Sequence, residues 1–240
     1  MRYSEFVYQG AKAASDYGEL DASYEAFLLG HLSENEKYAS FIDNAVREAN
    51  SFLQRISVLG KVPARIKTFE AIGNGNPSFE MDADFLRPLS VFQYRDDDHP
   101  RDYDVLPFKK LGKYVFVMGP YSPYRKIHIQ YRVAIPIYGL SDIPFISEYV
   151  TSNGQSHYDV AGDIYDSFYE AKEAAEEADI DLTESFGITD EVLMLGVDWI
   201  KARCRDDKSK GHQEEMEVES RLNDVADDEF IYEQRKARSF

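Results

Sequence analysis

The densest group of potential metal ligands lies in the segment YRDDDHPRDYD, residues 94–104. Carboxylate oxygens are the ligands that Ca²⁺ and Mg²⁺ prefer in proteins. The candidate ligands are Asp96, Asp97, Asp98, His99, Asp102 and Asp104. The segment lacks the alternating ligands and the terminal glutamate of a calcium-binding loop, and Pro100 favours an exposed turn. We therefore interpret it as a solvated acidic loop and keep a metal-dependent enzyme as a third hypothesis.

The other reactive residue types do not form a catalytic group. The five histidines are scattered, and no HExxH or comparable zinc-binding spacing occurs. The single cysteine, Cys204, lies between Arg203 and Arg205, whose charges could lower a thiol pKa. Adjacent residues of a helix do not share a face, however, and no histidine adjoins the cysteine. The sequence therefore predicts no catalytic residue, no metal and no cofactor.

Two segments place tyrosines beside arginines and prolines in predicted loops: FQYRDDD at 92–98 and PYSPYRK at 120–126. Tyrosine and arginine in loops are typical anchors of protein interfaces. The candidate contact residues are Tyr94, Arg95, Tyr121, Tyr124 and Arg125. The alternative is that these are ordinary loop tyrosines that pack partly on a sheet, and the sequence leaves both interpretations open.

The charge of the chain limits its partners. Its 240 residues include 27 basic and 44 acidic side chains, a formal net charge of −17. Such a surface repels phosphate backbones and disfavours tight nucleic-acid binding, although DNA could still slide past it. The chain has no secretory-type start and no run of roughly 18 apolar residues, so we expect a soluble protein without a membrane span.

Helical patterns occupy both ends of the chain. Apolar residues recur with three-and-four spacing from Tyr38 to Ile56, and Ser33 with Glu36 forms a capping box before them. Near the other end, Thr189 is a predicted helix cap.

After Thr189, Val192, Leu195 and Trp199 share one helix face and are expected to pack in the core. We predict that this helix continues into the charged run from Arg203 onward.

Between these ends the sequence is rich in β-branched and aromatic residues. Segments 113–119 and 126–139 are predicted strands. Because PYSPY connects them, we expect an antiparallel pair, with Pro136 at an edge or bulge and His128 on the exposed side.

The predicted fold class is therefore α+β. Helices from 1–72 and 164–226 form a bundle, an antiparallel, sandwich-like β module is inserted at 73–163, and an extended tail occupies 227–240.

Three stretches of the chain resemble the head-to-tail adaptor proteins of tailed bacteriophages, also called head-completion, connector or tail tubular A-like proteins. They are ENEKYASFIDNAVREANSFLQRI (34–56), IQYRVAIPIYGLSDIPFISEYVTSNGQSHYDVAGD (129–163) and GITDEVLMLGVDWIKARCRDDKSKGHQEEMEVESRL (187–222). Together they cover roughly half of the chain. The third is the most specific, because its leucines, glycine, tryptophan and basic residues follow the order of the family's final helix.

The resemblance implies a structural virion protein without catalytic residues or cofactors. It implies a ring of about twelve identical subunits beneath the portal protein, in contact with tail or tail-hub proteins and with DNA passing through unbound. It implies that the charged turns with Arg203 and Arg205 face a neighbouring subunit or the lumen of this ring. It also implies that the C-terminal segment docks on the portal. The residues that it assigns to docking are Phe230, Ile231, Tyr232, Arg235, Lys236, Arg238 and Phe240. The alternative hypothesis is an acidic intracellular module that binds a protein through its tyrosine-rich loops.

Overall fold

The chain forms two compact units in the computed structural model. The structure describes residues 1–15, 23–30, 36–71, 77–95, 102–205 and 208–238. Unit 1 combines Met1–Arg55 with Ile137–Phe240, and unit 2 is Ile56–Pro136. The predicted boundaries of the β module, at residues 73 and 163, differ from these divisions. The chain between 137 and 163 belongs to unit 1. Ser33, half of the predicted capping box, lies outside the described residues.

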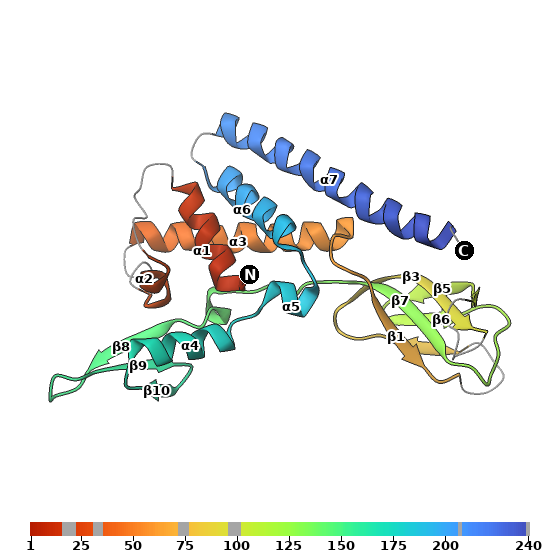
Figure 1. The fold of residues 1–240 in the computed structure, drawn as a ribbon, viewed down its shortest axis with the longest axis horizontal. Coiled ribbons are helices and arrows are strands. Elements are labelled where there is room, and N and C mark those ends of the chain that lie inside the picture. The colour runs from red at the N-terminus through yellow and green to blue at the C-terminus, as the bar shows by residue number, and fades with distance from the viewer. Residues whose placement is uncertain (16–22, 31–35, 72–76, 96–101, 206–207, 239–240) are drawn as a thin grey trace. The chain divides into compact units, whose positions relative to one another are not determined.

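Unit 1 is mainly helical (Figure 1). Its helices are α1 (Tyr3–Ala14), α2 (Tyr24–Leu28), α3 (Glu36–Leu59), α4 (Phe168–Ala178), α5 (Leu182–Phe186), α6 (Asp190–Cys204) and α7 (Lys208–Arg238), and a 3₁₀ turn, η1, spans Leu140–Asp142. Helix α3 confirms the predicted apolar pattern, since Ile42, Ala49 and Phe52 are buried along one side. Only its last turn lies beyond the division at Arg55.

The core of unit 1 lies where α1 and α6 pack together. Val192, Leu195 and Trp199 of α6 are buried, as predicted. The ring centroid of Phe52 on α3 lies 6.1 Å from that of Trp199 and 6.2 Å from that of Phe6. A Cβ atom at Gly196 would lie 2.6 Å from both Phe6 Cζ and Phe52 Cε1, which is closer than such atoms can approach. The absence of a side chain at Gly196 therefore permits this packing.

The charged run after Trp199 does not continue the same helix. Helix α6 ends at Cys204, and α7 begins at Lys208 and packs back along α6 (Figure 1). The direction is antiparallel, because Gly211 lies against Ala202 while Arg221 reaches Asp198 further back on α6. The prediction of one continuous helix is therefore wrong. The segment forms two helices, α6 and α7. Helix α7 also contributes buried apolar residues, Val218 and Leu222.

A buried asparagine fixes the segment through which the chain re-enters unit 1. The Asn50 amide nitrogen on α3 donates to the Tyr138 carbonyl oxygen at 2.6 Å, and the Asn50 Oδ1 atom accepts from the Tyr138 backbone N–H at 2.9 Å. Asn50 thus pairs with both backbone polar groups of Tyr138, and the Tyr3 hydroxyl also donates to the Tyr138 carbonyl oxygen, at 3.5 Å.

A three-stranded antiparallel sheet in unit 1 has the order β10-β9-β8. Its strands are β8 (Ile146–Val150), β9 (Ser156–Val160) and β10 (Asp163–Tyr165). Helix α4 packs on this sheet through Ala171 and Ala175, which are buried, and the Phe168 ring meets that of Tyr158 edge-on at 5.7 Å.

The described residues of unit 2 form two antiparallel sheets. The first has the order β1-β7-β3-β4, with β1 (Arg65–Phe69), β7 (Ile127–Val133), β3 (Phe85–Tyr94) and β4 (Tyr103–Val105). The second has the order β2-β6-β5, with β2 (Ser78–Glu80), β6 (Tyr114–Val117) and β5 (Phe108–Leu111). The described residues therefore give the α+β fold class that the sequence predicts.

The expected pairing of segments 113–119 and 126–139 is wrong. They form β6 and β7, which lie in different sheets, and β7 ends at Val133 with β1 and β3 on either side. His128 is buried rather than exposed, since Thr68 Oγ1 lies 2.9 Å from its Nδ1 and the Tyr94 ring packs on it at 4.6 Å. The hydrogen bond from Thr68 and the contact with Tyr94 thus allow the His128 imidazole to be buried, although the alternating pattern of β7 predicts a solvent-exposed side chain at this position.

Candidate interaction surface

One buried glutamine holds the tyrosine-rich loop of unit 2 in place. Gln93, on β3, is only 2% exposed. Its amide nitrogen donates to the carbonyl oxygens of Ser122 and Arg125, both at 2.9 Å, and its Oε1 atom accepts from the Ser122 backbone N–H at 2.8 Å. The loop therefore has a defined conformation without belonging to a strand. A hollow of about 290 Å³ lies beside it, lined among others by Tyr121, Arg125 and Asp104.

The predicted contact residues of this loop region have different roles. Tyr124 is 95% exposed, while Tyr121 and Arg125 line the hollow. Tyr94 instead packs within unit 2, with its ring 4.6 Å from His128 and 5.3 Å from Phe92. The structure thus brings Tyr121, Tyr124 and Arg125 together on one loop, and Tyr94 contributes mainly to packing.

Arg95 is committed to acidic neighbours in its own unit. Its guanidinium donates to Asp104 Oδ1 from Nε at 2.9 Å and from NH2 at 2.8 Å, and NH1 lies 3.2 Å from Asp102 Oδ2. The hydrogen bond from Arg95 lowers the pKa of the Asp104 carboxyl. Two carboxylates of the predicted acidic loop are therefore paired with an arginine. Asp96, Asp97, Asp98 and His99 lie outside the described residues.

Arg203 and Arg205 make contacts inside unit 1. Arg203 Nε donates to Glu48 Oε2 on α3 at 3.1 Å, and NH1 donates to Glu215 on α7 at 3.0 Å. Arg205 pairs with Glu214 of α7. These two arginines therefore tie α6 to α3 and α7 of the same chain, and their place in a subunit interface stays a prediction. Between them, burial raises the pKa of the Cys204 thiol to about 11, so it stays protonated at neutral pH.

The predicted docking tail is not extended. Helix α7 continues through Arg238, so its backbone includes Phe230, Ile231, Tyr232, Arg235, Lys236 and Arg238. Phe240 lies outside the described residues. The role of this segment in docking stays a prediction.

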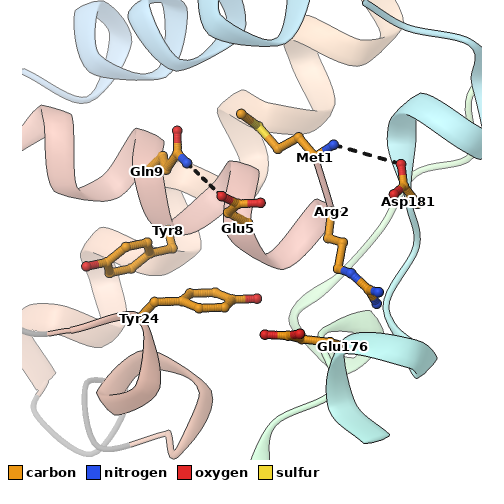
Figure 2. Close-up of a pocket in the computed structure, with 8 residues that line it drawn as sticks. All are labelled: Met1, Arg2, Glu5, Tyr8, Gln9, Tyr24, Glu176 and Asp181. Carbon is orange, nitrogen blue, oxygen red and sulfur yellow. Dashed lines mark hydrogen bonds and ion pairs between the residues drawn. The ribbon is translucent and has the colours of Figure 1, made fainter. Parts of the chain in front are cut away.

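A second candidate site is a pocket of about 380 Å³ in unit 1 (Figure 2). Its lining is formed by Met1, Arg2, Glu5, Tyr8, Gln9, Tyr24, Glu176 and Asp181. Figure 2 shows the rings of Tyr8 and Tyr24 on one side, with Arg2, Glu176 and Asp181 on the other. Among the described residues, this lining contains no serine, cysteine or histidine.

A chain of hydrogen bonds behind this pocket has a structural role. Asp179 Oδ2 accepts from the Ser4 backbone N–H at 3.0 Å and from Ser4 Oγ at 2.5 Å, and the Tyr24 hydroxyl lies 2.6 Å from the same Oγ. Helix α1 has no side-chain cap of its own, so Asp179 caps it from the other half of the unit. Asp181 caps α5 by accepting from the N–H groups of Thr183 and Glu184.

Replacing Asp179 with asparagine is expected to change how stability depends on pH. Burial raises the pKa of this carboxyl above its ordinary value, despite the hydrogen bonds from Ser4. The folded protein then keeps the proton to higher pH than the unfolded chain does. The contribution of Asp179 to the free energy of unfolding of the wild type should therefore fall as pH rises from about 4 through the folded-state pKa.

Asparagine does not titrate, so the Asp179→Asn protein should lack this contribution. Urea unfolding of both proteins from about pH 4 to pH 7 measures it, because the wild-type stability minus that of the variant should decrease with pH. A difference that stays constant over this range contradicts the assignment.

Among the described residues, no three histidine, cysteine, aspartate or glutamate side chains are grouped as a metal site would require. No helix in the described ranges combines the length and apolar composition needed to cross a bilayer. Comparisons of the chain with protein families, with curated proteins and with solved structures find no match.

Proposed function

We propose that this protein is a structural virion component of a tailed bacteriophage. In this proposal it forms a ring beneath the portal, joins the head to the tail and surrounds the DNA channel. The helices of unit 1 form the bundle that builds the body of the ring, and unit 2 is an inserted, sandwich-like β module. The resemblance of the stretches at 34–56, 129–163 and 187–222 to adaptor proteins motivates the proposal.

The structural observation that supports it best is the unequal division of charge between the units. Unit 2 contains 12 of the 27 basic residues and 9 of the 44 acidic residues, which leaves 15 basic and 35 acidic residues in unit 1. Unit 1 is therefore strongly acidic, whereas unit 2 has a small positive excess. Ring contacts are heterologous, so one surface of a subunit meets a different surface of the next. Opposite charges on different units favour such contacts over contacts between identical surfaces.

The same division suits a channel for DNA. An acidic wall repels phosphate groups and lets a duplex pass without binding. We propose that unit 1 supplies this wall and that the α7 segment from residue 230 onward docks on the portal.

The second candidate function is a module that binds a protein partner through the Gln93-anchored loop. The exposure of Tyr124 on a loop whose backbone is held by Gln93 favours it, because tyrosine has only two side-chain torsions to fix on binding. A monomer that binds a cellular protein, and loses that binding when Tyr121 and Tyr124 are replaced by alanine, would support this function.

Mixing the purified chain with its portal protein tests the adaptor proposal. We expect electron microscopy and sedimentation to show a ring of about twelve subunits attached to the portal. Monomers alone in the presence of portal would contradict it.

Deleting residues 230–240 is expected to abolish portal binding. The loss should be complete within the sensitivity of co-sedimentation, because the resemblance assigns docking to this segment. The core of unit 1 includes α7 residues only as far as Leu222 among those whose burial is described, so thermal unfolding should stay close to that of the wild type. Normal portal binding by the truncated protein contradicts the docking role, and a large drop in melting temperature would instead show that the segment stabilises the fold.

A further inference from the structure

Two arginines face each other across neighbouring strands of unit 2. Arg87 on β3 and Arg132 on β7 are direct cross-strand partners. Like charges in this arrangement destabilise a sheet. Register shifts flank Arg87 on both sides, between Phe85 and Arg87 and between Pro88 and Ser90, so the local strand geometry is irregular at this point.

Within the part of the chain that the structure describes, neither arginine forms an ion pair. Burial is the main cause that lowers the pKa of Arg132, and the positive charge of Arg87 lowers it further. The described carboxylates of unit 2 pair with other bases instead. These pairs are Glu70 with Lys126, Glu80 with Lys113, Asp82 with Lys67, Asp84 with Arg65, and Asp102 and Asp104 with Arg95.

The Arg132 side chain is held in place although its charge is not neutralised. Its Nε atom is buried and has no hydrogen-bond acceptor among the described residues. A Cβ atom at Gly60 would lie 1.5 Å from Arg132 NH1, so the guanidinium occupies the space that any other residue would fill there. Gly60 has a φ of +84°, which also favours glycine. The Arg87 side chain is exposed and can reach a ligand from solvent.

Other polar groups extend the same face of the sheet. Gln130 is two residues from Arg132 on β7 and therefore points to the same side. It pairs with Ser90 on β3, whose Oγ lies 3.4 Å from Gln130 Oε1. This face thus combines two guanidinium groups with neutral hydrogen-bonding side chains, a combination that suits an oxyanion.

We propose that Arg87 and Arg132 bind carboxylate side chains from unit 1 of a second copy of this chain. This inference rests on the ring that we propose as the function, and it names the contact through which one subunit recognises the next. Unit 1 has 35 acidic and 15 basic residues, so a neighbouring copy offers carboxylates in excess. Guanidinium groups bind carboxylates with two parallel hydrogen bonds, and the incoming charge would relieve the repulsion between the arginines.

The substitution Arg87→Glu tests the proposal because it should have opposite effects on the monomer and on assembly. In the monomer, the new carboxylate at position 87 faces Arg132 and replaces a repulsion with an attraction, so the melting temperature should rise by about 2–4 °C. In assembly, the site for a neighbouring carboxylate is lost. The protein concentration for half-maximal ring formation should increase at least about tenfold.

Lys109→Glu is the matched control. It makes the same charge change at an exposed residue of unit 2 that has no described ion pair, and it should leave both quantities near their wild-type values. Sedimentation velocity and thermal unfolding measure the three proteins under the same salt conditions. Unchanged assembly of Arg87→Glu beside an assembling wild type overturns the inference and leaves the ring proposal standing.

If the wild type does not assemble, with or without portal, the ring proposal is wrong, and a second copy of the chain cannot be the partner of the two arginines. Thermal shifts with polyglutamate and with inorganic phosphate at equal ionic strength then decide whether the arginines form a site at all. Stabilisation of the wild type but not of Arg87→Glu by polyglutamate assigns the site to carboxylates of another protein. A larger shift with phosphate assigns it to phosphate, and no shift with either probe removes the site.

Discussion

Replacing Asn50 with leucine is expected to lower the free energy of unfolding of unit 1 by about 3–5 kcal/mol. The Asn50 side chain satisfies both backbone groups of Tyr138, at 2.6 Å and 2.9 Å, and Asn50 and Tyr138 are both buried. Leucine has a similar size but cannot form hydrogen bonds. The Tyr138 N–H would then remain buried without its acceptor, and the Tyr138 C=O would keep only the long hydrogen bond from the Tyr3 hydroxyl at 3.5 Å; a buried group left unsatisfied costs about 1–3 kcal/mol.

Urea unfolding followed by tryptophan fluorescence measures this loss. The only tryptophan, Trp199, lies in the core of unit 1, so its signal reports on that unit. Asn44→Leu is the matched control, because Asn44 lies on the same helix but is not fully buried. A loss no greater than that of the control would show that the Asn50–Tyr138 bonds contribute little to stability.

Replacing Gly196 with valine is expected to cost about 3 kcal/mol or more. A Cβ atom at this position would lie 2.6 Å from the rings of Phe6 and Phe52, and valine adds two further methyl groups. Both rings are fully buried and have no free space into which to move. Helix α6 would have to shift away from α1, which separates two helices that form the core of unit 1.

Met194→Val controls for the effect of valine on the helix itself. Met194 lies on α6 two residues earlier, and its side chain is about half exposed. Valine there should cost only about 0.5 kcal/mol, through its lower helix propensity. Equal losses for the two variants would mean that the packing at Gly196 is not tight.

The sequence patterns predicted the features of the fold that depend on residues close together in the chain. The apolar spacing from Tyr38 to Ile56 predicted α3, and the Thr189 cap with the buried face of Val192, Leu195 and Trp199 predicted α6. Helical periodicity is a local property, so a single segment reveals it. The end of α6 was missed because the residues after Cys204 are almost all polar, so no break in an apolar pattern marks where one helix ends and the next begins.

Features that depend on distant residues could not be predicted in the same way. The loop PYSPY resembles a hairpin connection, but β6 and β7 pair with other strands because each sheet is completed by segments from elsewhere in unit 2. Asp179 caps a helix that begins 176 positions earlier, at Tyr3, and nothing in either segment alone identifies the partner.

The candidate sites show the same limit. Tyr121, Tyr124 and Arg125 were predicted as a surface from their types, and the structure gathers them on one loop. Gln93 was missed because a glutamine between Phe92 and Tyr94 in a strand is assigned to the solvent-facing side of an alternating pattern. The ion pairs of Arg203 and Arg205 within the chain were missed because their acidic partners on α3 and α7 become adjacent only after these helices pack against α6.

Unit 1 is built from two stretches of chain, and this arrangement sets an order for folding during translation. Helices α1 and α3 leave the ribosome before the 81 residues of unit 2 have been made, and α6 follows later still. Phe6 and Phe52 therefore cannot pack in the core until Gly196 and Trp199 have been synthesised. Unit 2 is complete in the nascent chain before that and can fold first. We expect the apolar faces of α1 and α3 to be the surfaces that chaperones must protect on the ribosome.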